Sequence, residues 1–143
     1  MHQSGIIFRE LAPARVQIAD TDGRAVLTDF ELAKLLDGSP TVSSEWPEDP
    51  FRAPEIDSGH CTPQSDLYSF GRLTLATLGC DLTASLADQY NALAGLTAAG
   101  ASKKLVKLLQ QCLEPLDSRR PADMQTLLPE LERWAGKQKA GKA

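Results

Sequence analysis

The chain has 143 residues, of which 42% are hydrophobic and 24% charged, so it can form one globular domain with a substantial core. Its formal net charge of -4 provides no basic surplus for nucleic acid, and no apolar stretch reaches the roughly 18 residues that span a bilayer. Three cysteines without C-x-x-C spacing and two histidines indicate neither a disulfide framework nor a zinc site, so a reduced, cytoplasmic protein is expected.

The first predicted element is a short β-hairpin near the N-terminus. Residues 16–19 (V-Q-I-A) and 25–28 (A-V-L-T) flank a turn-rich stretch that contains the turn signal Asp22-Gly23. Residues 29–55 then lack any periodicity, which predicts a long irregular loop. Its interrupting residues are Gly38, Pro40, Pro47 and Pro50.

Helices are predicted in the rest of the chain, beginning with one that follows the N-cap Thr62 and ends before Gly79. Apolar residues lie on nearly all sides of this helix, which is typical of a helix at the centre of a domain. A weaker amphipathic helix is expected over residues 83–93, and residues 95–100 are expected to be a linker. The apolar side of the weaker helix carries Leu86, Tyr90 and Leu93.

Two further helices complete the expected fold. Ser102 caps a helix with core positions at i, i+3, i+4 and i+7, namely Leu105, Leu108, Leu109 and Cys112. Pro121 is expected to open the last helix and Gly136 to end it, which leaves residues 137–143 as a flexible basic tail. The residues expected to point inward from it are Met124, Leu127, Leu128, Leu131 and Trp134. The predicted fold is mainly α, a helical bundle with one small hairpin.

A series of short motifs occurs in an order typical of one family. Residues 8–15 read F-R-E-L-A-P-A-R, and the later motifs are D-F-E at 29–31, F-R-A-P-E at 51–55, S-D-L-Y-S-F-G at 65–71 and R-R-P at 119–121. The series resembles the C-terminal lobe of eukaryotic-type protein kinases, whose loops read H-R-D-L-x-x-x-N, D-F-G and A-P-E. Because chance matches to one or two short motifs are common, the joint order carries the resemblance.

The resemblance covers roughly residues 5–135 and implies an α+β family fold with its N-terminal lobe absent. The C-lobe-like domain is placed at residues 1–136, and the loop at residues 29–55 corresponds to an activation segment. The helix that precedes the catalytic loop in the family is also absent. The face that this helix would cover is therefore expected to bind a protein partner or a second copy of the chain, unless the chain is a fragment of something larger. An apolar strip there would come from Leu73, Leu75 or Leu78.

The resemblance also implies a set of structural anchors. In the family, the glutamate of A-P-E pairs with an arginine of the last motif, so Glu55 is expected to pair with Arg120. The aspartate of S-D-x-Y-S-F-G hydrogen-bonds to the backbone of the catalytic loop, a role that falls to Asp66. Arg9 retains the arginine of the catalytic loop itself. The scaffold positions are therefore kept.

The positions that carry phosphoryl transfer are replaced. Glu10 stands where the family has the aspartate that accepts the substrate proton, and a misplacement of about 1 Å can cost roughly 10²-fold in rate. Arg15 replaces an asparagine that helps to hold magnesium, and arginine is a donor-only cation. Asp29 is the metal-ligand position that remains, so we expect Arg15 to pair with it in place of the ion. The alternative is that Arg15 points to solvent. An apolar contact of Phe8 with Phe30 is also expected.

The resemblance thus implies a pseudokinase-like domain that serves as a scaffold or regulatory interaction module, with no catalytic residue, cofactor or metal. One alternative is an atypical Ser/Thr protein kinase completed by an N-lobe from elsewhere. It would use ATP and magnesium, with Glu10 as the base and Asp29 as the metal ligand. Another alternative is an unrelated helical adaptor, in which Glu55 and Arg120 would not be paired. Neither nucleic acid nor a membrane is an expected partner.

Overall fold

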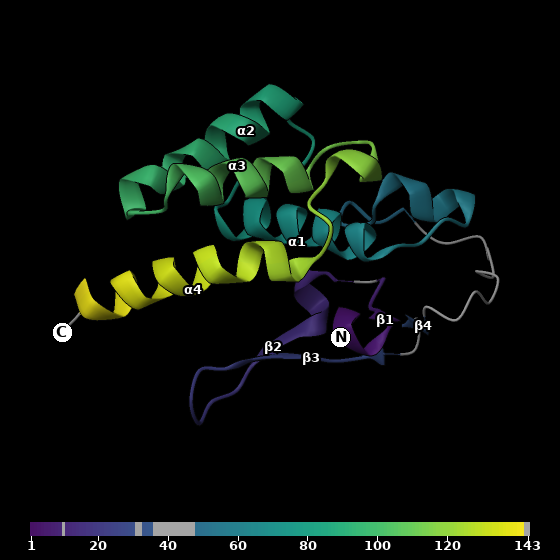
Figure 1. Ribbon diagram of the computed structural model, residues 1–143, viewed down its shortest axis with the longest axis horizontal. Helices are drawn as coiled ribbons and strands as arrows, with labels where there is room; N and C mark the ends of the chain where they lie inside the picture. The colour runs from purple at the N-terminus through teal and green to yellow at the C-terminus, as the bar shows by residue number, and fades with distance from the viewer. Residues whose placement is uncertain (10, 31–32, 36–47, 142–143) are drawn as a thin grey trace.

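The computed structural model describes residues 1–9, 11–30, 33–35 and 48–141. Helices α1 (Pro63–Thr77), α2 (Leu86–Ala94), α3 (Lys103–Cys112) and α4 (Met124–Gly141) form one helical layer of the molecule. Figure 1 shows the N-terminal strands below this helical layer, where α1 and the start of α4 meet them. The expected mainly α fold is confirmed. Within the described residues, no helix has the length and apolar character needed to cross a bilayer.

The strands form two separate antiparallel pairs within the described residues. Strand β2 (Val16–Ile18) pairs with β3 (Ala25–Leu27), with Val16 opposite Leu27, which confirms the predicted hairpin. Strand β1 (Ile6–Ile7) pairs with β4 (Lys34–Leu35), and this second pair was not predicted. A two-residue strand carries no period-2 pattern, and its partner is remote in sequence, so the residues themselves contain no signal for the pair.

Helix α1 begins and ends as its sequence predicts. The backbone N–H of Thr62 donates to Ser65 Oγ at 3.1 Å, and Gly79 closes the helix with φ of 70°. Leu67 and Leu75 are fully buried at the centre of the core. Gly71 lets α1 approach α3 closely, because a Cβ atom there would lie 2.9 Å from the Cδ2 atom of Leu113. The close packing of α1 against α3 therefore depends on a residue without a side chain.

Helix α3 also follows its prediction. Ser102 Oγ accepts a hydrogen bond from the backbone N–H of Leu105 at 3.0 Å, which caps the first turn. All four predicted stripe residues are buried and belong to one apolar cluster with α1. The stripe consists of Leu105, Leu108, Leu109 and Cys112. Helix α3 thus supplies one side of the core on which α1 packs.

Helix α2 begins three residues later than predicted, at Leu86, and its N-cap is Ser85, which accepts from the backbone N–H of Asp88. Leu86, expected on the apolar side, is 39% exposed, whereas Gln89 is buried. The Gln89 amide can be buried because it donates to the carbonyl oxygens of Leu82 and Ala84. The predicted linker at 95–100 is also wrong, since a 3₁₀ helix (Gly95–Ala99) buries Leu96 there.

Helix α4 differs from its prediction at both ends. It begins at Met124 rather than Pro121, and it continues through Gly136 to Gly141, so the expected boundary at residue 136 lies inside a helix. Trp134 Nε1 donates to the carbonyl oxygen of Ala99 at 2.8 Å, and Gln138 donates to the same atom. These contacts outweigh the roughly 1 kcal/mol that a helical glycine costs. Leu128, expected to point inward, is 37% exposed.

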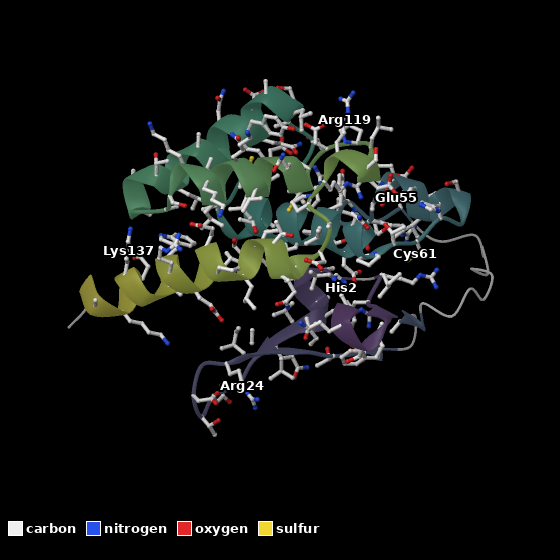
Figure 2. All side chains as sticks on the ribbon, in the orientation of Figure 1. His2, Arg24, Glu55, Cys61, Arg119 and Lys137 are labelled. Carbon is white, nitrogen blue, oxygen red and sulfur yellow. The ribbon has the colours of Figure 1, made fainter. Side chains whose placement is uncertain are left out.

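Short 3₁₀ helices connect the main elements. Besides Gly95–Ala99, those in the described part of the chain include His2–Ser4, Pro13–Arg15, Pro54–Ser58 and Asp117–Arg119. The segments at Pro13–Arg15 and Pro54–Ser58 carry two of the residues that the sequence singles out, Arg15 and Glu55. Figure 2 shows Glu55 beside the helical layer and His2 at the junction between the helices and the N-terminal strands.

Candidate functional site

A bidentate ion pair joins the segment that precedes α1 to the loop that precedes α4. Arg120 Nη1 donates to Glu55 Oε1 at 2.6 Å, and Nη2 donates to Oε2 at 2.9 Å. Arg120 is 5% exposed and also donates to the carbonyl oxygens of Gln64, Glu114 and Pro115. The pair expected from the resemblance is present, and the unrelated-adaptor alternative, which required its absence, is contradicted.

The electrostatics of Glu55 favour the charged form. Burial alone would raise the pKa of its carboxyl group, but the hydrogen bonds from Arg120 and from Ser65 Oγ outweigh burial and hold the pKa below its ordinary value. The guanidinium of Arg120 also lies over the ring of Tyr68, 4.8 Å from its centroid. A planar cation with every donor engaged therefore fixes this corner of the fold.

Asp66, in the first turn of α1, holds the loop that contains Arg9. Its Oδ2 atom accepts from the backbone N–H of Phe8 and its Oδ1 atom from that of Arg9, both at 2.7 Å. The φ of Arg9 is 73°, a left-handed conformation that few non-glycine residues adopt. Two charge-assisted hydrogen bonds stabilise this backbone, as the resemblance implied for Asp66.

His2 adds a contact that the sequence analysis missed. Its Nε2 atom lies 2.8 Å from Asp66 Oδ2. The side chain of His2 is 14% exposed and that of Asp66 is 6% exposed. A lone histidine near the N-terminus carries no sequence signal for such a contact, because its partner Asp66 is 64 residues away.

The hairpin brings Arg15 and Asp29 together. Arg15 immediately precedes β2, and Asp29 is the second residue after β3, so the pairing of the strands places both at the same end. Arg15 Nη1 lies 2.9 Å from Asp29 Oδ2, so the pair expected from the sequence is present. The two side chains are 33% and 51% exposed, and a pair this open is worth about 1 kcal/mol or less. Glu10 lies outside the described residues.

The expected aromatic contact next to this pair is also present. The rings of Phe8 and Phe30 meet edge to face, with centroids 5.1 Å apart and an interplanar angle of 76°. Phe8 is buried, whereas Phe30 is 49% exposed. Packing between the two loops is thus retained.

The expected apolar strip on α1 is partly wrong. Leu75 is fully buried because it packs against α3 in the core cluster, and Leu73 is half-buried. Leu78 is 43% exposed. The sequence could not predict which of these three residues is buried, because a helix with apolar residues on all sides has no preferred buried face.

No family model matches the chain. Cyclin-dependent kinase F-3 of Oryza sativa subsp. japonica is 34% identical over 79 residues, which are 51% of this chain and 17% of that protein. Serine/threonine-protein kinase AtPK1/AtPK6 of Arabidopsis thaliana is 39% identical over 75 residues, 51% of this chain and 16% of that protein.

A bacterial relative extends the same similarity. Serine/threonine-protein kinase D of Synechocystis sp. (strain ATCC 27184 / PCC 6803 / Kazusa) is 33% identical over 85 residues, which are 54% of this chain and 17% of that protein. About half of this chain is therefore similar to protein kinases, and the matched part is about a sixth of each relative. A protein-kinase-like region is what these similarities support.

Proposed function

We propose that this chain is a pseudokinase-like domain, without catalytic activity, that serves as a scaffold or regulatory protein-interaction module. The contact between Arg15 and Asp29 carries the proposal. The resemblance implies that both positions would hold magnesium in an active kinase. A guanidinium at 2.9 Å supplies the positive charge that the carboxylate would otherwise take from the ion, and arginine has no lone pair with which to coordinate a metal.

The retained anchors support a structural role. The Glu55–Arg120 pair and the Asp66 contacts to the loop backbone join segments of the fold, and neither contact requires a nucleotide. A domain with these contacts keeps a defined surface for a partner after the phosphate-handling residues have changed. The proposal includes a cytoplasmic location, no cofactor, and a protein or a second copy as partner.

A second candidate function is an atypical Ser/Thr protein kinase. The names of the relatives favour it, since AtPK1/AtPK6 and kinase D are both serine/threonine-protein kinases. Such an enzyme would be completed by an N-lobe from elsewhere and would use ATP and magnesium. Glu10 would act as the base and Asp29 as the ligand of one metal ion.

Binding of ATP with magnesium distinguishes the two candidate functions. We expect ATP with magnesium to leave the melting temperature unchanged, whereas a ligand at 100 times its Kd would add about 2.7 kcal/mol of stability. Transfer of labelled phosphate to a generic protein substrate should also be absent. Arg15→Asn, which restores the metal-binding residue type, is the matched variant for both measurements.

Phosphate incorporation by the unaltered chain, lost in Asp29→Asn, would overturn the proposal in favour of the kinase. A magnesium-dependent ATP shift in Arg15→Asn that the unaltered chain lacks would support the view that the guanidinium replaces the ion. Arg24→Asn serves as the control, because this exposed arginine lies on the same hairpin, remote from Asp29 in the strand register.

A further inference from the structure

A cavity of about 400 Å³ lies where the N-terminal segment, β3 and the starts of α1 and α4 meet. This volume falls within the range of about 300–1,000 Å³ in which proteins bind ligands. Apolar side chains from all of these elements line it, namely Phe8, Leu11, Leu27, Pro63 and Met124. Figure 2 places His2, another lining residue, at this junction. The interior of the cavity is therefore largely apolar.

The apolar surface continues beyond the cavity along two of its walls. In the β2–β3 register, Ile18 lies on the same face as Leu27, and Ile18 is 62% exposed. On α4, Leu128 follows Met124 by one helical turn and is 37% exposed. Both walls thus extend the apolar lining outward, which suits an elongated occupant better than a compact small molecule.

The charged side chains that line the cavity are both carboxylates, Asp66 and Asp123. Asp66 is engaged by backbone N–H groups and by His2. Asp123 accepts from Thr126, but no lysine or arginine of the described residues forms an ion pair with it. The Nδ1 atom of His2 is buried without a hydrogen-bond partner among the described residues.

We propose that this cavity and its two apolar walls bind an amphipathic segment of a partner protein, with a lysine or arginine that pairs with Asp123. Apolar side chains of that segment fill the cavity and cover Ile18 and Leu128. The inference rests on the proposed interaction role and deepens it, because it states the chemistry of the partner. Charge complementarity selects a basic segment over an acidic one.

The test selects peptides from a random phage-displayed library on the immobilised chain, without nucleotide. We expect the enriched peptides to combine apolar residues with lysine or arginine. Binding of a labelled selected peptide, measured by fluorescence anisotropy, should weaken about tenfold in Ile18→Ser, the equivalent of about two buried methylene groups. It should weaken about fivefold in Asp123→Asn, as for the loss of one exposed ion pair.

Two control variants test whether the loss of binding is specific to this surface. Val26→Ser alters the same hairpin on its opposite face, and Asp88→Asn makes the same change in net charge on α2. Both should bind as the unaltered chain does. Asparagine can replace aspartate in the turn before α4, because both are good N-cap residues, and melting temperatures verify that all four variants fold.

Enrichment of peptides without basic residues, equal binding by Ile18→Ser, or no enrichment at all would overturn the inference. Self-association that Ile18→Ser abolishes, measured by sedimentation velocity, would also overturn it and assign the surface to a second copy. None of these results bears on the proposed lack of phosphoryl transfer, so failure here is distinguishable from failure of the proposed function.

Discussion

Arg72 on α1 donates from Nε to the carbonyl oxygen of Pro50 at 2.7 Å, which ties the segment that precedes α1 to this helix. The same guanidinium donates to Gln89 Oε1 and to the carbonyl oxygen of Leu82. Arg72 is 9% exposed, so these three acceptors are satisfied by one buried cation. The contact therefore connects the segment before α1, the α1–α2 loop and α2.

Replacement of Arg72 tests this connection. We expect Arg72→Met to lower the free energy of unfolding by about 2–4 kcal/mol, because it removes a buried cation's hydrogen bonds to Gln89 Oε1 and to the part-buried carbonyl oxygen of Pro50 while keeping much of the side-chain volume. Urea unfolding followed by circular dichroism measures the change. Arg24→Met, at a side chain that is 75% exposed, should change stability by less than about 0.5 kcal/mol. Equal effects of the two substitutions would contradict the role of Arg72.

A second prediction concerns how much the Glu55–Arg120 pair contributes to stability. Arg120→Ala should lower the free energy of unfolding by about 3–5 kcal/mol, because Glu55 keeps a partly buried charge without its partner. Its sequence neighbour provides the control. Arg119 is 69% exposed, so Arg119→Ala should have little effect. A double-mutant cycle with Glu55→Gln should give a coupling energy well above zero, and additive effects would show that the pair contributes nothing.

The lowered pKa of Glu55 predicts how stability depends on pH. Because the folded-state pKa lies below the ordinary value of 4.5, the stabilisation is present above pH 4.5 and is lost as pH falls through the folded-state pKa. Glu55→Gln should therefore be less stable than the unaltered chain at neutral pH, and the difference should shrink as the solution is acidified below pH 4.5. Unfolding measured at a series of pH values tests this, and a difference independent of pH would contradict it.

Two glycines in helices should respond to alanine with opposite signs. Gly71→Ala should destabilise the fold by about 1–3 kcal/mol, because the new Cβ would meet Leu113 Cδ2 at 2.9 Å and α1 or α3 would have to shift. Gly136→Ala should stabilise it by about 0.4–1 kcal/mol, because nothing lies within 4 Å of a Cβ there. Thermal unfolding of both variants gives the two signs, and a shared sign would refute the argument from close packing.

The sequence by itself determined the elements whose signals are local. The hairpin follows from two short apolar runs around a turn, α1 from its caps, and α3 from a stripe that repeats at helical spacing. The Glu55–Arg120 and Arg15–Asp29 contacts could be expected as well, but through the order of motifs in the resemblance rather than through any local pattern.

Only the tertiary structure decided the features that depend on distant partners. Strand β4 exists through its pairing with β1, Gln89 is buried because carbonyl oxygens of the preceding loop accept its amide, and α4 passes Gly136 because Trp134 and Gln138 bind Ala99. The physical reason is that intrinsic preferences amount to about 1 kcal/mol or less per residue. A few hydrogen bonds from elsewhere in the fold are enough to reverse them.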